Sequence, residues 1–569
     1  MDLGDNITDE STATGRMCIA CGHLPQSYSL YGLFDDYQQC RISNGESCGV
    51  CNKFKHLESQ ILEAKRTLDE LVSQYQDLKT QRNHIHDPIT SRIPPEVVSY
   101  IFQLCLPSPP SKSDPLHDLD MEEGPSPLKF GAVCRDWRKV AWATPRLWTV
   151  LRFCISVPSF RARCDLAQQW LARSGGLPLT IYIFTPFLSN SSPSPVVVSS
   201  FIKLVNQYSS RWYQLRLNVP TSLLLQFCGD STSHSTLHTL HIHPDDRPQS
   251  HSIRRFSLNN VKPSPANVFI SSLSFSAVDI EWNNVTQVEF GGLQLDECFE
   301  LLKRAPKLVC CKFHNSLMSQ SDQERFPVPE YTITHHQIRV FNLSYPFDSD
   351  VVSFLCDKVC FPALVDLSCE MPCFLPTESL VAFFKRSSCL IEDLFLYDAL
   401  FHDDDNLIDL LRAIPSLQRL KIVPNMWGDY SPDHLFDLLA RTSIANNDDG
   451  TFLPKLQSFS YSMEQPGIGW NHLPNIFGPL WELDNPRRRP LNSVHIRLDR
   501  DEENREPLKY IEKDILLHLL SILEAGLDLT ITYLEEDRDF IKASVEYRGM
   551  ADDDEDDSSS DEGHMSSEE

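Results

Sequence analysis

The sequence predicts an α+β or α/β repeat fold, preceded by an N-terminal coiled-coil helix and a small helical module and followed by a disordered acidic tail. Three observations lead to this prediction: a heptad pattern of apolar residues over 57–85, a short helical segment closed by tryptophan over 91–148, and apolar triplets that recur to about residue 545. We therefore expect the chain to consist of segments 1–51, 52–87, 88–150, 151–545 and 546–569.

The composition favours a folded protein that ends in an acidic tail. The 569 residues carry a formal net charge of −27, and 41% of them are hydrophobic, which allows a sizeable core. Residues 551–569 contain six Asp, four Glu and no Lys or Arg, so the rest of the chain carries −17. This balance argues against nucleic-acid binding, which needs a basic face, but allows a protein target with a basic surface.

The acidic tail allows two interpretations. Its serines at 558–560 stand among Asp and Glu residues, so an acidophilic kinase could phosphorylate them. The alternative is a tail that only keeps the protein soluble, because runs of like charge repel one another and stay disordered.

The N-terminus carries no sign of export or membrane insertion. Residues 1–10 are acidic where a signal peptide would be basic and then apolar, and no stretch approaches 18 consecutive apolar residues. The 18 cysteines are then expected to be reduced thiols. We expect a cytoplasmic and/or nuclear protein that does not span a membrane.

Two Cys-x-x-Cys pairs in segment 1–51 have the form of zinc knuckles. Four thiolates can surround a tetrahedral zinc ion when each pair closes a tight turn. The candidate ligands are Cys18, Cys21, Cys48 and Cys51. The alternative is a cysteine-containing tail that binds no metal, because the gap between the pairs is longer than in the common zinc ribbon.

Segment 52–87 predicts a coiled-coil helix. Its apolar residues are separated by alternating steps of four and three, as in the a and d positions of a heptad, and the phase continues to Ile85. The seam residues are Leu57, Ile61, Ala64, Leu68, Leu71, Tyr75 and Leu78. Such a helix could join two copies of the chain, or it could fold back on its own domain as an amphipathic helix. It should end near residues 86–88, because the residue before Pro88 is pushed out of the α region.

The segment 88–150 predicts a small helical module. Pro94 and Pro95 precede an apolar helical pattern that Pro107 ends, and a Pro/Ser-rich insertion at 107–127 is typical of a loop. A second helix is expected to carry Val133, Trp137, Val140 and Ala141 on one face. The module then closes on Leu147 and Trp148.

This module resembles an F-box, whose members read Leu/Ile-Pro-x-Glu followed by apolar pairs and Ile-Phe, later Val-Cys-basic-x-Trp, and finally Leu-Trp. The order of the parts resembles the large F-box families of mushroom-forming fungi, although the insertion departs from the compact F-box. The resemblance implies docking on a Skp-type adaptor and a cullin ligase. The residues expected to bind the adaptor are Ile93, Pro94, Pro95, Val97, Val98, Ile101, Phe102, Val133, Cys134, Trp137, Val140, Leu147 and Trp148. The alternative is a generic helical module with a buried tryptophan.

Segment 151–545 is expected to form one array of helix–strand units. The apolar triplet alone arises often by chance, but Pro-x-Leu starts and preceding helical segments recur with it, at spacings near 26 residues. Such units resemble irregular leucine-rich repeats, which bury their strands by stacking into a solenoid. The expected triplets are Trp212/Leu215/Leu217, Leu237/Leu240/Ile242, Ile270/Leu273/Phe275, Val285/Val288/Phe290, Leu308/Cys311/Phe313, Ile338/Phe341/Leu343, Leu364/Leu367/Cys369, Ile391/Leu394/Leu396, Leu417/Leu420/Ile422, Leu456/Phe459/Tyr461 and Leu491/Val494/Ile496. A non-repetitive α/β domain is the alternative.

No catalytic motif is recognisable, so we expect a protein that is not an enzyme and has no cofactor apart from the possible zinc. The histidine pair at 335–336 and the run of four residues at 402–405 are expected to be solvated loop residues, and the histidines at 238, 241 and 243 are expected to be exposed strand residues. The F-box resemblance implies a substrate-recognition subunit of an SCF-type ubiquitin ligase with an unknown protein target. Two alternatives stay open: a scaffold that binds the adaptor without ubiquitin transfer, and an enzyme whose site forms only on folding.

Overall fold

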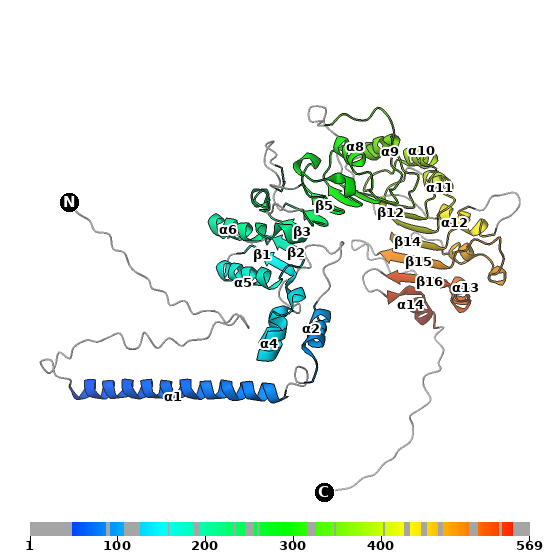
Figure 1. The fold of residues 1–569 in the computed structure, drawn as a ribbon. Coiled ribbons are helices and arrows are strands. Elements are labelled where there is room, and N and C mark those ends of the chain that lie inside the picture. The colour runs from blue at the N-terminus through cyan, green and yellow to red at the C-terminus, as the bar shows by residue number, and fades with distance from the viewer. Residues whose placement is uncertain are drawn as a thin grey trace, which may run out of the picture. The chain divides into compact units, whose positions relative to one another are not determined.

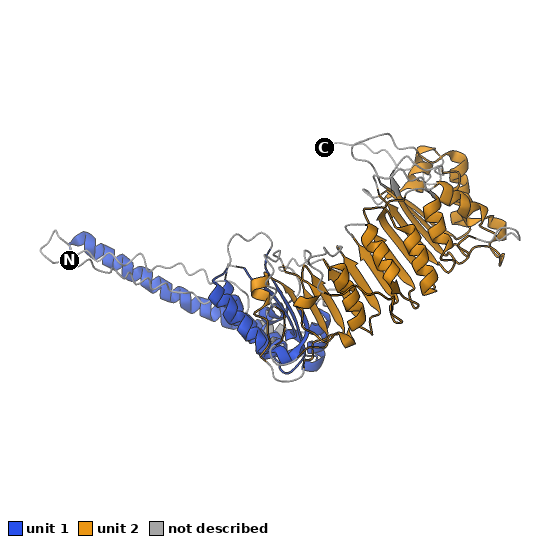
Figure 2. Cartoon of the chain, turned by 90° about the horizontal axis from the view of Figure 1, so that it is seen from above, with its two compact units in different colours: residues 1–215 blue, residues 216–569 orange. Residues whose placement is uncertain are grey.

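The computed structural model shows a mixed α/β protein with a large parallel sheet. It describes residues 48–86, 92–106, 126–156, 159–186, 193–230, 235–244, 255–258, 262–315, 326–345, 349–401, 404–425, 433–444, 452–464, 470–499, 510–533 and 538–549. The chain divides into two compact units, residues 1–215 and 216–569 (Figure 2). The predicted acidic tail beyond residue 549, the insertion at 107–125 and the first 47 residues lie outside the described ranges.

Unit 1 begins with one long helix, α1 (Gly49–His86), drawn in blue in Figure 1. It is described as far as His86, and residues 87–91, where we expect its end, lie outside the described ranges; its start includes Cys51, which we had placed in the preceding segment. The heptad side chains are exposed, from 38% at Ile61 to 74% at Ile85. Within the described residues of this unit, the seam stays exposed. A helix folded back on its own domain would instead have its seam buried.

The helical module contains α2 (Pro95–Leu104), α3 (Pro127–Val133), α4 (Arg135–Trp142) and the 3₁₀ turn η3 (Pro145–Trp148). The expectation that Val133 shares a helix face with Trp137 and Val140 is wrong, because the helix breaks at Cys134. This residue is extended, with φ −153° and ψ 175°, and its Sγ accepts a hydrogen bond from the Trp137 N–H at 3.4 Å. Val133 consequently points to solvent.

The rest of unit 1 continues directly from the module. It comprises β1 (Val150–Cys154), α5 (Phe160–Arg173), β2 (Leu179–Phe184), α6 (Pro195–Asn206), η4 (Ser209–Arg211) and the first residues of β3 (Trp212–Asn218), because the boundary between the units lies within this strand. Strands β1 and β2 pair in parallel, with Val150 opposite Thr180. The boundary expected at residue 150 thus falls inside a compact unit.

Unit 2 alternates strands with helices and 3₁₀ turns. Its elements are α7 (Thr221–Leu224), β4 (Thr239–Ile242), β5 (Asn267–Ser271), η5 (Phe275–Ala277), η6 (Trp282–Asn284), β6 (Gln287–Gly291), α8 (Leu295–Arg304), β7 (Cys310–His314), β8 (Ile333–Thr334), β9 (Val340–Ser344), α9 (Ser349–Lys358), β10 (Val359–Cys360), β11 (Asp366–Glu370), α10 (Thr377–Ser387), β12 (Asp393–Ala399), α11 (Asp404–Arg412), β13 (Arg419–Pro424), α12 (Asp433–Arg441), β14 (Ser458–Glu464), η7 (Leu473–Phe477), η8 (Leu480–Glu482), β15 (Ser493–Asp499), α13 (Lys513–Glu524), β16 (Asp528–Tyr533), β17 (Arg538–Asp539) and α14 (Phe540–Tyr547).

The large sheet of unit 2 follows the order of the chain. From β4 to β16 each strand pairs in parallel with the next strand of the sheet, while the short strands β8 and β10 pair separately. Helices α8 to α12 line one side of the curved row of strands (Figure 1). Alternate residues of most strands are buried, and the register aligns them into apolar rows such as Leu367, Leu394 and Leu420.

The predicted strand triplets agree with this register in all cases but one. Ile270/Leu273/Phe275 is wrong, because β5 ends at Ser271 and Ser272 has a φ of +59°. The buried strand residues are Val268 and Ile270, and Phe275 lies in the following 3₁₀ turn. The apolar pattern fits both frames, so only the pairing with β4 and β6 selects the correct one.

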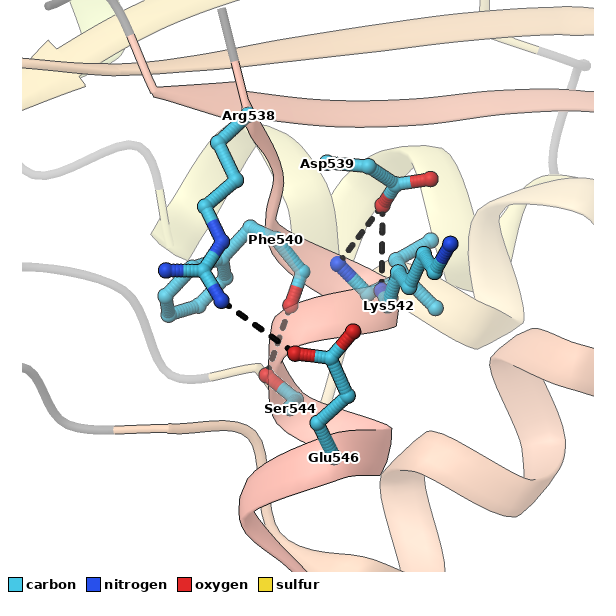
Figure 3. A network of polar contacts seen from close by, with 7 residues as sticks. Arg538, Asp539, Phe540, Lys542, Ser544 and Glu546 are labelled. Carbon is cyan, nitrogen blue, oxygen red and sulfur yellow. Dashed lines mark hydrogen bonds and ion pairs between the residues drawn. The ribbon is translucent and has the colours of Figure 1, made fainter. Parts of the chain in front are cut away.

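The last strand of the parallel sheet is covered by a short antiparallel strand and a helix. Strand β17 pairs with β16, and Asp539 caps α14 by accepting hydrogen bonds from Ile541 N at 2.9 Å and Lys542 N at 3.1 Å (Figure 3). Arg538 and Glu546 form an ion pair at 3.2 Å. Covering an edge strand in this way hinders pairing with another chain. The folded array therefore extends past residue 545, where we had expected the tail to begin.

Candidate interaction surfaces

The core of the helical module is built around Trp148. Its side chain is fully buried, and its Nε1 donates a hydrogen bond to the Ala141 carbonyl oxygen at 2.8 Å. Trp142 and Trp170 meet its ring edge to face, with centroids at 5.2 and 4.8 Å. Trp170 lies on α5, so the module shares its core with the segment that follows. This contact could not be predicted from the sequence, because no local pattern pairs a tryptophan with a residue on a distant helix.

A second group of rings connects α2 with α3 and α4. Phe102 stacks on Phe130 with centroids 4.5 Å apart and lies 4.9 Å from Trp137. Four residues that we had assigned to adaptor binding therefore belong to the module's own core: Val98, Phe102, Leu147 and Trp148. These four buried residues support the outer surface of the module by packing beneath it, but they are not exposed on it.

The outer side of α2 carries an apolar stripe. Val97, Tyr100 and Leu104 are exposed, at 46%, 58% and 67%, and their spacing of three and four residues places them on one helix face. Ile101 is half-buried beside them. Tyr100 and Leu104 were not among the predicted adaptor residues, although they follow the same helical periodicity.

The remaining predicted adaptor residues divide by exposure. Pro94, Pro95 and Val133 are exposed. Ile93, Trp137 and Val140 are partly buried against the core, and Cys134 is partly buried. The exposed stripe on α2 is therefore a candidate protein-interaction surface, because contiguous exposed apolar side chains are often covered by a partner.

The open face of the sheet in unit 2 presents polar and aromatic side chains in register. Asp366, Asp393 and Arg419 align across β11, β12 and β13, and Asp393 forms an ion pair with Arg419. In the next outward row, the Lys421 ammonium lies 4.7 Å from the centroid of the Phe395 ring. These two contacts connect side chains of β12 and β13 on the open face of the sheet.

An acidic and aromatic group lies at the carboxyl ends of β9, β11 and β12. Glu370 accepts a hydrogen bond from Tyr345, which raises the pKa of the tyrosine to about 12. Asn425 donates to Asp398 at 2.6 Å, while burial and the nearby Glu370 raise the pKa of Asp398. Tyr397 is exposed next to them. Carboxylates beside aromatic faces are suited to contact a cationic side chain.

Two histidine expectations are changed by the structure. His335 is buried, and its Nε2 lies 3.0 Å from the Ala305 carbonyl oxygen, whereas we had expected a solvated loop residue. His241 stacks on Phe269, and burial, with Arg216 and His243 nearby, lowers its pKa to about 3. Asp404 and Asp405 begin α11, while His402 lies outside the described residues.

Buried carboxylates in unit 2 have structural partners. Glu297 accepts hydrogen bonds from the backbone N–H groups of Phe275 at 3.0 Å and Gln294 at 3.3 Å. Asp296 accepts one from Phe326 N at 3.0 Å. These side chains therefore cap a helix and fasten neighbouring loops, as buried carboxylates commonly do.

Two of the four predicted zinc ligands, Cys48 and Cys51, lie within the described residues. The Sγ atoms of Cys48 and Cys51 are 3.6 Å apart, close to the roughly 3.8 Å edge of a tetrahedron with zinc–sulfur bonds of about 2.3 Å. Cys18 and Cys21 lie outside the described residues. Among the residues that are described, no group of three or more His, Cys, Asp or Glu side chains could hold a metal ion.

Within the described ranges, no helix combines the length and the apolar character needed to cross a membrane. No protein-family model matches the chain, and no curated protein matches it in sequence.

Proposed function

We propose that this protein is a non-catalytic substrate-recognition subunit of an SCF-type ubiquitin ligase. The module at 92–148 would dock on a Skp-type adaptor and its cullin, and unit 2 would hold a protein target. The observation that carries the proposal is the exposed stripe of Val97, Tyr100 and Leu104 on α2, in a module whose spaced residues resemble an F-box. The protein would act by positioning, since a tethered target has a high effective concentration near the ligase.

The target surface in this proposal is the open face of the sheet. We interpret the succession of strands as an irregular leucine-rich-repeat-like solenoid, because neighbouring strands pair at offsets of 26 and 27 residues. The acidic and aromatic group of Tyr345, Glu370, Tyr397 and Asp398 would select a target segment that contains Lys or Arg. The acidic balance of the whole chain supports the same choice.

Zinc binding by Cys18, Cys21, Cys48 and Cys51 is part of the proposal. The separation of the Cys48 and Cys51 sulfur atoms supports it. A zinc ion there would fasten the start of α1 to the segment before it and would have a structural role.

Adaptor docking is tested by co-purification of the full chain with a Skp-type adaptor and a cullin. The double variant Val97→Asp with Leu104→Asp places two charges on the stripe, and it should weaken recovery of the adaptor by about 100-fold or more. Both side chains are exposed, so the core and the tryptophan fluorescence should be retained. Arg146→Asp, an exposed change on η3, is the matched control.

Each outcome of this experiment has a clear meaning. Unchanged recovery of the adaptor with the double variant would refute docking through α2. Recovery of the adaptor without the cullin would favour a scaffold that does not direct ubiquitin transfer.

A further inference from the structure

We infer that α1 pairs with the α1 of a second copy of this chain in an antiparallel coiled coil. The inference goes beyond the proposed function and rests only on the side chains of this helix. The pairing of α1 can therefore be tested independently of adaptor docking.

The seam of α1 begins one residue of the heptad pattern earlier than Leu57, at Phe54. The same heptad phase includes Phe54, so position a is occupied by Phe54, Ile61, Leu68, Tyr75 and Arg82, and position d by Leu57, Ala64, Leu71, Leu78 and Ile85. All ten side chains are exposed in the single chain. A continuous apolar stripe of this length needs a covering helix.

A parallel pair fits this seam poorly. In a parallel homodimer each seam residue faces the same residue of the other copy. Ala64 would face Ala64 and leave a gap, while Tyr75 would face Tyr75 and crowd the next layers. Arg82 would face Arg82, which places two like charges inside the seam.

An antiparallel pair resolves all three conflicts. Position a then faces position d, and the alignment with Leu68 opposite Leu71 of the second copy uses the whole seam. Ala64 faces Tyr75, so a small side chain meets a large one in both symmetry-related layers. Arg82 faces Leu57, where its methylene stem can cover the leucine while the guanidinium reaches water. The remaining layers pair Ile61 with Leu78 and Phe54 with Ile85.

The flanking charges agree with this alignment and provide a test. In the antiparallel pair, Glu58 faces Lys79 of the second copy, twice by symmetry. In a parallel pair, Glu58 would instead face Lys53, and Lys79 would face the neutral Gln74. Lys79 therefore contributes to pairing in the antiparallel arrangement alone.

The orientation has a consequence for the assembled protein. The paired segments span residues 53–86, which at 1.5 Å per residue is about 50 Å. The two chains leave an antiparallel pair at opposite ends, so the modules that follow each α1 start about 50 Å apart rather than side by side. Such a dimer suits targets with two separated binding segments.

The first test is the dimer dissociation constant of the full chain, measured by sedimentation velocity. Lys79→Glu should weaken the dimer about tenfold, because two attractive pairs become repulsive. Glu58→Lys should weaken it similarly, and the double variant should restore the original affinity. Lys55→Glu, the same substitution type at position b away from the seam, should have little effect.

The contrary outcomes are distinct. If Lys79→Glu has no effect and the double variant is as weak as Glu58→Lys, the pair is parallel. A chain that stays monomeric at all accessible concentrations overturns the pairing itself.

The second test maps the contact directly. Benzoylphenylalanine in place of Tyr75 is photo-crosslinked in a mixture of unlabelled and ¹⁵N-labelled chains, which identifies links between copies. After trypsin digestion, the antiparallel pair should link residue 75 to the peptide 56–65 of the other copy. A link to the peptide 67–79 of the other copy would refute the proposed orientation.

Discussion

Arg489 offers the sharpest test of how unit 2 is held together. It is only 1% exposed, and its guanidinium donates to three backbone carbonyls. The acceptors are Leu439 at 2.8 Å, Thr442 at 3.0 Å and Phe452 at 2.8 Å, with the Thr442 hydroxyl at 2.7 Å. Burial, with Arg488 beside it, lowers the pKa of Arg489 to about 10. This value is still above neutral pH, so the side chain remains a charged donor.

Replacing Arg489 with Met should destabilise this region by about 3–5 kcal/mol. The change removes a costly buried charge, but it leaves three buried carbonyls without donors, each costing about 1–3 kcal/mol. Arg489→Lys should cost less, because an ammonium keeps the charge and can reach some of the acceptors. The exposed Arg487 provides the matched control, and Arg487→Ala should stay within about 0.5 kcal/mol of the original chain.

Hydrogen exchange with mass spectrometry suits this measurement, because two units need not unfold together. Peptides from 433–444 and 452–464 should lose protection by a factor of about 100 or more in Arg489→Met, since every 1.4 kcal/mol is tenfold. Equal exchange in Arg489→Met and Arg487→Ala would refute the assignment of the carbonyl contacts as a main support of this region.

Three further predictions concern the module, pH and metal. Gly131→Ala should destabilise the helical module by about 1–3 kcal/mol, because the new Cβ would lie 2.0 Å from the Trp142 ring; unchanged thermal unfolding would contradict the packing. His241 has a pKa of about 3 in the fold, below its ordinary 6.5, so its neutral form is preferred and unit 2 should lose stability as pH falls from about 6.5 towards 3. Comparing urea unfolding at pH 7 and pH 5 should show a smaller loss in His241→Phe than in the original chain, and an equal loss would exclude this histidine. Metal analysis of the full chain should find close to one zinc per chain, reduced by Cys48→Ser with Cys51→Ser; a value near zero in the original chain would dismiss zinc.

Much of the secondary structure followed from local patterns. The heptad steps predicted a helix over the residues of α1, because this periodicity is a property of neighbouring residues on one helix. The strand triplets around Leu367 and Leu420 were recognised because a Pro-x-Leu start accompanied each of them, and the one around Leu394 because a helical segment precedes it. Where this context was weaker, at Ile270, the frame was wrong.

The candidate surface was predicted in part. The residue types and spacings of the module indicated which side chains belong together, but not which face the core and which face solvent. Phe102 and Trp148 proved to be core residues, whereas Tyr100 and Leu104 proved to be exposed. That division depends on where α3, α4 and α5 pack, and such contacts between distant segments leave no local pattern.

The sequence by itself determined the order of the parts, the phase of the α1 seam and the alternation of buried residues along most strands. Only the tertiary structure decided the break at Cys134, the burial of His335 and the role of Arg489 within a run of three arginines. The physical reason is that periodicity specifies which side of an element is apolar. The satisfaction of a buried polar group depends instead on carbonyls and hydroxyls brought to it from elsewhere in the chain.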